Sequence, residues 1–560
     1  MVQGILRTLS SSIRGLHQAA YLLAALTLVS QILALARDRI FAHAFGASET
    51  LDLYYAAFRV PDLVFALIAS LVSAYVLIPR IAGGDKEETR RLLSHATSFL
   101  LISGGVICLV LAALMPTLLA VLFPDLVSSP RRDEFVFLSQ LLLLQPILLG
   151  LSGIITSVTQ VHRRFALFAL SPVLYNAGII FGAVALYPVM GLPGIGVGVV
   201  IGAIAHVLIH IPVVREAGVL PRLLAPSWSV VWSIARDSIP RSLALSFGAL
   251  TTLLLTMLAS RTAEGAVSVF TLAGNLEAVP LALIGASYAT AAFPVLSEEA
   301  TGKRDEAFKA TLTAAGRHLL FWSSVVAVIA IVLRAHLVRV IYGTGAFDWD
   351  ATRITAALLG ILVMGLAAQC LVLLASRAFY AARRSWNPLI IQAAGLVVSV
   401  AGALGMLMLA DSVPTFRYFV EALLRIEDYP GSRVVFIALG ATIGQLFMGA
   451  LALITLHQIA PGVAKNLMRP LSEGAAAGIV GGAAAYGVLA VLGNIAPLST
   501  LGSVFTQGLL AGMVGLAVSA SVLILLENRE FRDLYESLRK LTSTKALAPS
   551  GTVLNDQANP

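Results

Sequence analysis

The sequence contains little charge. Only 12% of its 560 residues are Asp, Glu, Lys or Arg, about half the share of about 25% found in soluble domains. Hydrophobic residues make up 58%, and the mean hydropathy is +0.89. This composition excludes a soluble multi-domain enzyme. Apolar stretches recur that can cross a hydrocarbon core of about 30 Å, which takes about 20 helical residues. We therefore predict an all-α polytopic membrane protein.

Cysteine is almost absent. Cys108 and Cys370 both fall inside apolar segments, which excludes a disulfide framework and a cysteine-based zinc site. The phosphate-binding pattern G-x-x-x-x-G-K-[ST] does not occur, which disfavours an ATP-driven pump. We expect a transporter rather than an enzyme, with no catalytic residue, no cofactor and no metal site.

Two motifs resemble ligand sites but fit helix packing better. The glycines between Gly194 and Gly202 open an apolar helix with no strand before it, which favours close helix packing over a dinucleotide-binding turn. His206 and His210 are one helical turn apart, but no carboxylate lies near them in the same helix. Packing is therefore favoured over metal binding.

The charge that is present is mostly positive. The net charge is +8 and the pI is about 9.6. The Lys and Arg residues lie in short loops between apolar segments, so membrane topology explains them better than a nucleic-acid-binding face. We expect membrane lipids as partners and no nucleic acid.

Fourteen membrane spans are predicted. They start near residues 19, 55, 95, 135, 165, 190, 238, 265, 314, 354, 388, 434, 473 and 500. The first run, 19–36, continues directly into Arg37-Asp38-Arg39 and is interpreted as a retained helix rather than a signal peptide. With fourteen spans, more Lys and Arg lie on the side that holds both termini, so the termini are predicted to be cytoplasmic.

An internal repeat divides the chain. Pro61 and Pro280 are 219 residues apart, and the pairs Arg163-Arg164 and Arg383-Arg384 are 220 apart, each followed by a similar apolar pattern. Both offsets join one span to the sixth span after it, so the repeats have the same orientation in the membrane. We predict two parallel-repeat six-helix lobes plus two C-terminal helices. The expected parts are an N-lobe at 1–225, a C-lobe at 226–460, spans 13 and 14 at 461–526, and a cytoplasmic tail at 527–560.

The tail is expected to begin as a charged amphipathic helix. Its apolar positions are Phe531, Leu534, Leu538 and Leu541. Its last fifteen or so residues are polar and are expected to be disordered.

Polar residues inside the spans mark a candidate substrate site. A charge at mid-helix costs about 2.5 to 3.5 kcal/mol on insertion scales, so such residues indicate a cavity. The candidates are Gln31, Arg37, Asp38, Asp52 and Arg59 in the first two spans, and Asn275 and Glu277 in the eighth. A salt-bridged loop at the membrane surface is the alternative for Arg37, Asp38 and Asp52. Cations in such a site suit an anionic head group such as a phosphate.

The motifs resemble those of one transporter family. The matching blocks are 30–38, 45–47, 52–61, 164–166, 171–176, 343–348 and 377–381, in this order along the chain. Together, these blocks resemble the motifs of the MurJ (MviN) family of lipid II flippases, in the MOP exporter superfamily. The resemblance implies movement of an undecaprenyl-diphosphate-linked peptidoglycan precursor across the bacterial inner membrane, by rocking of the two lobes around a cationic cavity. It also implies that the last two helices form a groove for the lipid tail.

The sequence departs from the family at its cavity cations. The family's arginines would fall at Gln31, near Phe65-Ala66 and at Asn275, none of which is basic, whereas Arg37, Asp38 and Asp52 match. Either the substrate is held differently, or other arginines, namely Arg59, Arg241 and Arg261, take their place. Span eleven has no acidic residue, so no sodium site is carried over.

The sequence leaves three hypotheses for the function. The first is a lipid II flippase that works by alternating access. The second is a flippase for another polyprenyl-linked saccharide. The third is a non-transporting scaffold that binds wall-synthesis or division proteins. A continuous solvent-filled cavity lined by Arg37, Asp52 and Asn275 would favour transport, and a plugged apolar interface between the lobes would favour the scaffold.

Overall fold

The computed structural model describes residues 16–68, 74–427, 429–495 and 500–533. Within these ranges the chain is helical and forms no strand. The helices of the first half are α2 (Leu16–Phe45), α3 (Glu49–Ala57), α4 (Arg59–Ile68), α5 (Ala74–Gly83), α6 (Lys86–Phe99), α7 (Gly105–Leu122), α8 (Pro124–Val127), α9 (Arg132–Leu142), α10 (Leu144–Val161), α11 (Phe165–Phe181), α12 (Tyr187–Met190), α13 (Leu192–Leu208) and α14 (Ile211–Ala217). Those of the second half are α15 (Trp228–Ser260), α16 (Ala266–Pro280), α17 (Ser287–Thr301), α18 (Asp305–Tyr342), α19 (Trp349–Leu362), α20 (Leu366–Ala381), α21 (Trp386–Ser412), α22 (Pro414–Leu424), α23 (Val434–Leu456), α24 (Val463–Ile495) and α25 (Leu501–Leu525).

Twelve stretches of these described helices are long and apolar enough to cross a membrane. They lie within 86–525 and coincide with twelve of the predicted spans, which confirms the polytopic all-α fold. The other two predicted spans fall on α2 and on α3 to α5, which are not among the twelve. The total of fourteen spans therefore stays a prediction.

Several spans are interrupted where the sequence disfavours a regular helix. α16 ends at Pro280 and continues as a π-helical segment at Leu281–Ala286 before α17 begins. Similar segments at Leu100–Gly104 and Gly182–Leu186 join α6 to α7 and α11 to α12. Proline and π-helical turns are the usual causes of bends in helices. In the eighth predicted span the π-helical segment begins directly after Pro280.

Glycines set the closest helix packing in the first half. A Cβ atom on Gly178 of α11 would lie 2.4 Å from the Cα of Gly202 on α13, and one on Gly198 would lie 2.4 Å from the Cα of Gly182. The two backbones can approach this closely only because none of these residues has a side chain. This confirms the packing interpretation of the glycine-rich segment that begins at Gly194.

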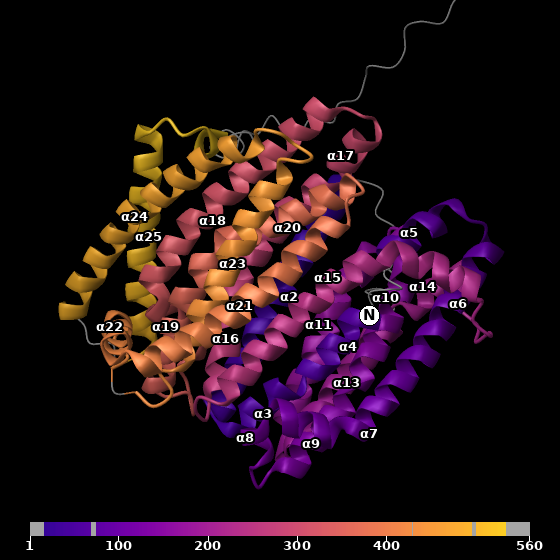
Figure 1. Cartoon of the computed structure of the whole chain (residues 1–560), viewed down its shortest axis with the longest axis horizontal. Helices are drawn as coiled ribbons and strands as arrows, with labels where there is room; N and C mark the ends of the chain where they lie inside the picture. Colours follow the sequence, from indigo (N-terminus) through magenta and orange to yellow (C-terminus); the bar gives the residue numbers. More distant parts are fainter. Residues whose placement is uncertain (1–15, 69–73, 428, 496–499, 534–560) are drawn as a thin grey trace, which may run out of the picture.

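The helices of the two halves gather on different sides of the molecule (Figure 1). α2 to α14 form one group, α16 to α23 form the other, and α15 lies between them, in contact with α4 and α21. α24 and α25 pack against each other and against α18, at the outer edge of the second group. The core is built from buried aliphatic and aromatic side chains of both groups.

A turn with a left-handed residue ends two helices at the predicted repeat positions. Arg163 and Arg383 both have φ of 55°. In each case the backbone amide of the following residue donates to the carbonyl oxygen five residues earlier. Arg164 donates to Thr159 at 3.0 Å, and Arg384 donates to Phe379 at 2.8 Å. This agrees with the repeat at this point, although Lys303 (φ 53°) adopts the same turn after α17. The turn is therefore a general helix end in this chain.

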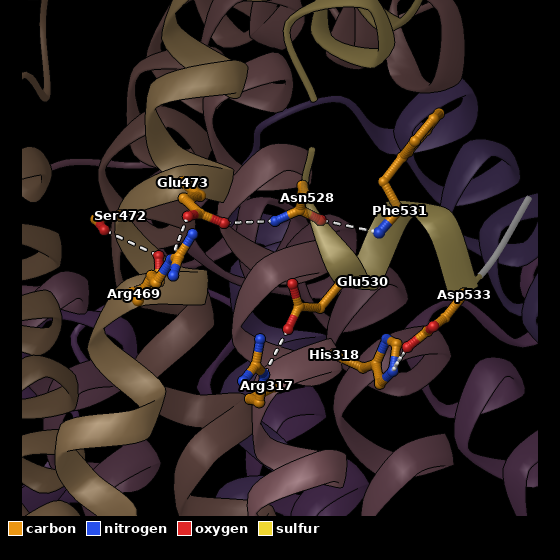
Figure 2. A network of polar contacts seen from close by, with 9 residues as sticks. All are labelled: Arg317, His318, Arg469, Ser472, Glu473, Asn528, Glu530, Phe531 and Asp533. Carbon is orange, nitrogen blue, oxygen red and sulfur yellow. Dashed lines mark hydrogen bonds and ion pairs between the residues drawn. The ribbon is translucent and has the colours of Figure 1, made fainter. Parts of the chain in front are cut away.

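The residues after α25 fold back onto α18 and α24 (Figure 2). The Glu530 carboxylate, which is 2% exposed, accepts a hydrogen bond from Arg317 Nε at 2.6 Å. Asn528 donates to Glu473 at 2.6 Å, and His318 faces Asp533 at 3.6 Å. We call these six residues the C-terminal clamp.

The predicted tail helix begins in this region. Residues 529–533 are helical, and Phe531 packs against the core between α18, α24 and α25. The predicted apolar positions Leu534, Leu538 and Leu541, and the expected disorder beyond them, lie outside the described residues.

Candidate functional site

A polar cluster joins the first and eighth predicted spans. Asp38 on α2 is 1% exposed and accepts from Arg37 Nη2 at 2.7 Å and from Arg37 Nε at 2.9 Å. Its other carboxylate oxygen accepts from Asn275 Nδ2 on α16 at 2.9 Å. Arg37 Nη1 donates to Asn176 Oδ1 on α11 at 2.9 Å. We call Arg37, Asp38, Asn176 and Asn275 the polar cluster.

The cluster neutralises its charges internally. A carboxylate removed from water is tolerated when it is paired and its remaining lone pairs are bonded, and Asp38 meets both conditions. Arg37 remains 19% exposed. The sequence predicted Arg37, Asp38 and Asn275 as site residues. It did not single out Asn176 for this role, because Asn176 comes from a helix that lies 139 residues further along the chain.

Asp52 makes different contacts from the other predicted acidic residues. The side chain of this residue on α3, 1% exposed, accepts from the backbone amides of Gly265 and Ser268, each at 2.7 Å, and from the Ser268 hydroxyl. These amides belong to the first turn of α16, where the helix dipole favours a negative charge. Asp52 therefore caps a helix of the second group from the first group.

Short loops of the two groups interlock beside this cap. The amide of Ala346 donates to the carbonyl of His43 at 2.9 Å. Gly46 and Gly345 have φ of 64° and 59°, and a Cβ atom on either would lie 2.4 Å from a backbone oxygen of the opposite loop. Glycine is required at both positions by conformation and by space. The blocks 45–47 and 343–348, singled out in the sequence, thus meet in space.

A further contact holds the same end closed. Arg39 on α2 donates through Nη1 to the carbonyls of Val340 and Ile341 at the end of α18, at 2.5 and 3.1 Å. We call these loop contacts, together with the Asp52 cap and the Arg39 bonds, the loop seal. The side chains that form it are few, and most of its bonds involve the backbone.

A cavity of about 410 Å³ with a mixed polar and apolar lining lies next to the polar cluster, between α15, α16, α20, α21 and α23. Its polar lining residues are Arg59, Thr251, Thr252, Thr271, Asn275, Glu277, Gln369, Gln392, Ser399 and Gln445. We call it the central cavity. Arg59 reaches it from α4 of the first group and donates to Thr271 Oγ1 at 3.1 Å. Gln369 donates to the Glu277 carboxylate, which is 6% exposed.

The predicted residues divide between three places. Asn275, Arg59 and Glu277 line the central cavity, Arg37 and Asp38 lie beside it in the polar cluster, and Asp52 lies in the loop seal. Gln31 precedes Arg37 on α2 and does not line the cavity.

Of the arginines considered as replacements for the missing family cations, one reaches the cavity. Arg59 is in the lining, whereas Arg241 and Arg261 are not. Three glutamines, Gln369, Gln392 and Gln445, are among the other polar residues of the lining. The sequence did not single out these glutamines, although amides within apolar helices were a signal that could have found them.

His206, on α13, and His210, just after the C-terminal end of α13, both contact hydroxyl groups. Ser152 Oγ lies 2.7 Å from His206 Nδ1, and Thr156 Oγ1 lies 2.7 Å from His210 Nε2. Thr159 Oγ1 lies 3.2 Å from His210 Nδ1. All three hydroxyls come from α10, so these contacts fit the packing interpretation.

Comparison with known proteins points to one family. The model of the family described as "Lipid II flippase MurJ" matches residues 41–469. A lipid II flippase MurJ of Burkholderia cenocepacia is 25% identical over 397 residues, which cover 69% of this chain and 77% of the relative. A probable lipid II flippase MurJ of Thermotoga maritima is 25% identical over 431 residues, covering 74% and 87%.

Solved structures share the fold. The structure of a lipid II flippase MurJ in an inward closed conformation aligns with a TM-score of 0.70 and 19% identity, over 91% of this chain and all of the other. An inward-facing MATE multidrug resistance transporter of the MOP superfamily aligns with a TM-score of 0.61 and 17% identity, over 81% and 98%.

Proposed function

The chain belongs to the lipid II flippase MurJ family, and from this membership we propose that it carries lipid II from the inner to the outer leaflet of the bacterial inner membrane. The protein is then a transporter, and its partners are the lipid-linked peptidoglycan precursor and membrane lipids. The observation that carries the proposal is the polar cluster of Arg37, Asp38, Asn176 and Asn275, which links the two helix groups beside the central cavity.

Alternating access follows from where the contacts lie. The loop seal closes one end through a small number of hydrogen bonds, most of which have one charged partner and are worth about 1.5 to 3 kcal/mol each, so the contacts that a rocking motion must break are few and are confined to this end. The lobes at 1–225 and 226–460 are proposed to rock about the polar cluster. The polar head group crosses inside the protein and the prenyl chain stays in lipid, which avoids the cost of moving polar groups through hydrocarbon.

The topology completes the proposal. Both termini are cytoplasmic, so the loop seal and the end of α18 face the outer side of the membrane. The C-terminal clamp then faces the cytoplasm. Spans 13 and 14, at 461–526, accommodate the lipid tail, which we place in the apolar groove between α18 and α25. Wall-synthesis or division proteins are proposed as partners of the cytoplasmic tail.

The lining of the central cavity favours a second candidate substrate. One arginine and three glutamines line it, and amide groups bind sugar hydroxyls through both donor and acceptor atoms. This favours a flippase for another polyprenyl-linked saccharide as the alternative. Of the three residues expected to line a transport cavity, Asn275 does so, whereas Arg37 and Asp52 are not in the lining, so the choice between transport and a non-transporting scaffold is made by the flipping assay.

A flipping assay in liposomes tests the proposal. The purified protein is reconstituted with fluorescent lipid II or with a polyprenyl-diphosphate carrier of a different saccharide, and the fraction of label that becomes accessible outside is followed. We expect faster flipping of lipid II than of the other carrier, and a loss in the Arg37→Ala variant. Preference for the other saccharide would establish the alternative, and equal rates with empty liposomes would refute transport.

A further inference from the structure

A second and larger cavity lies outside the transport site. It encloses about 870 Å³ between α18, α19, α22 and α24, a volume within the range of small-molecule sites. Its lining contains Arg334, Arg353 and Arg425 and no Asp or Glu. We call it the cationic pocket.

The three arginines keep their charge without a carboxylate. Arg334 donates to the carbonyl of Ile331 in its own helix at 2.8 Å, and its charge interacts with that of Arg425. Arg353 lies over the ring of Tyr429, 4.3 Å from its centre, and donates to its hydroxyl. Within the described part of the chain, none of the three takes part in a salt bridge. Like charges gathered in this way favour a bound anion.

His336 adds an unpartnered polar group to the same wall. Both of its ring nitrogens are inaccessible to solvent and have no hydrogen-bond partner among the described residues. It lines the cationic pocket and also an apolar groove between α18 and α25. His336 therefore marks the place where the cationic pocket and the apolar groove meet.

Aromatic residues place the pocket at the level of the lipid head groups. Trp349 and Tyr486 line it and are 43% and 57% exposed. Trp and Tyr are enriched at this level of a bilayer. On α22 the apolar side chains Tyr418, Phe419 and Leu423 are 64%, 64% and 66% exposed, as in a helix that lies in the membrane interface. A soluble anion would leave these apolar surfaces uncovered.

We propose that the cationic pocket binds the phosphate head group of an anionic glycerophospholipid. The guanidinium groups of Arg334 and Arg425 donate to the phosphate oxygens, for which their planar geometry is suited. Apolar residues of α24, such as Ile479 and Leu489, line the same pocket and contact an acyl chain. With the proposed topology the lipid belongs to the outer leaflet. The inference does not depend on which molecule is flipped.

Lipid binding to the full-length protein tests this inference. The protein is purified in a neutral detergent, and binding of phosphatidylglycerol, phosphatidylcholine and inorganic phosphate is measured separately by native mass spectrometry and by the shift in Tm. The variant Arg334→Gln/Arg425→Asn removes two charges, and Asn tolerates the left-handed backbone at position 425 (φ 59°). Arg132→Gln, at an exposed arginine that begins α9, is the matched control.

We expect phosphatidylglycerol to bind and raise the Tm of the wild-type protein and of Arg132→Gln. Its affinity for the double variant should fall about tenfold or more, while the Tm without lipid stays close to that of the wild type. Phosphatidylcholine and inorganic phosphate should bind weakly to all three proteins. Equal phosphatidylglycerol affinity in the double variant and the wild type would overturn the proposal, as would inorganic phosphate that binds as tightly as the lipid.

Discussion

At the scale of single residues, Asp38 connects the two helix groups. It is buried, pairs with Arg37 and accepts from Asn275 on the opposite group. Its partner Arg37 in turn reaches Asn176. A side chain with bonds to both groups is positioned to respond when the groups separate.

Removal of one partner of this pair should be costly. We expect Asp38→Ala to lower the free energy of unfolding by about 3 kcal/mol, because Arg37 keeps a charge with no carboxylate beside it. Thermal unfolding in detergent measures this. The double variant Arg37→Ala/Asp38→Ala should recover most of the stability and none of the flipping activity. If the double variant were as unstable as the single one, the pair would not be the cause.

The glycines of the loop seal make a second prediction at this scale. Gly345→Ala places a Cβ atom 2.4 Å from the His43 carbonyl oxygen and strains a backbone with φ of 59°. The left-handed conformation alone costs about 1 to 2 kcal/mol, so we expect the seal to open. Labelling of a cysteine introduced at Ser268 should become faster in this variant. Gly405→Ala, where a Cβ meets nothing within 4 Å, is the control and should label like the parent protein.

At the scale of elements, the C-terminal clamp attaches α25 to α18. Burial raises the pKa of Glu530, but the hydrogen bond from Arg317 and the neighbouring charges lower it more, so the net pKa lies below the ordinary value of 4.5. A carboxylate whose pKa is depressed by folding contributes stability above its unfolded pKa and loses it as the pH falls through its folded pKa. The contribution of Glu530 to the stability of the folded protein is therefore fully present at neutral pH.

This gives an expected pH dependence. The difference in Tm between the wild type and Glu530→Gln should be largest at pH 6 to 7 and should shrink as the pH falls below about 4.5. Arg469 is the matched control: it also pairs with a glutamate, Glu473, but is far more exposed than Arg317, so Arg469→Gln should have a smaller effect at neutral pH. A Glu530→Gln difference that grew on acidification would contradict the assignment.

The elements were easier to predict from sequence than the contacts between them. A bilayer requires about 20 apolar residues per helix, so most spans could be read from the apolar runs. Asn176 and Gln369 are amides within apolar runs, but their pairing with Arg37 and Glu277 could not be read from the sequence, since the partners lie 139 and 92 residues apart. Asp52 was expected at the substrate site because it is an acid near a span end, but whether it caps a helix depends on the position of α16.

At the scale of the whole molecule, there are two helix groups (Figure 1). They meet through the polar cluster and are closed at one end by the loop seal. Most bonds of the seal join a charged side chain, Asp52 or Arg39, to backbone groups of the other helix group, so its strength depends on both charge and fit. Such an interface can separate as a unit, because the same few contacts are lost together. The central claim is that the seal must open in each transport cycle.

A reversible cross-link across the seal tests this claim most directly. The backbone amide of Glu49, at the start of α3, donates to the Glu264 carboxylate, just before α16, at 3.2 Å, so the two positions face each other beside the Asp52 cap. Cysteines replace both glutamates in a chain with Cys108→Ala and Cys370→Ala, and the protein in liposomes is treated with a short bifunctional methanethiosulfonate and assayed for flipping. We predict that flipping stops on cross-linking and returns on reduction, while each single-cysteine variant is unaffected by the reagent. Undiminished flipping with the cross-link complete would contradict the account.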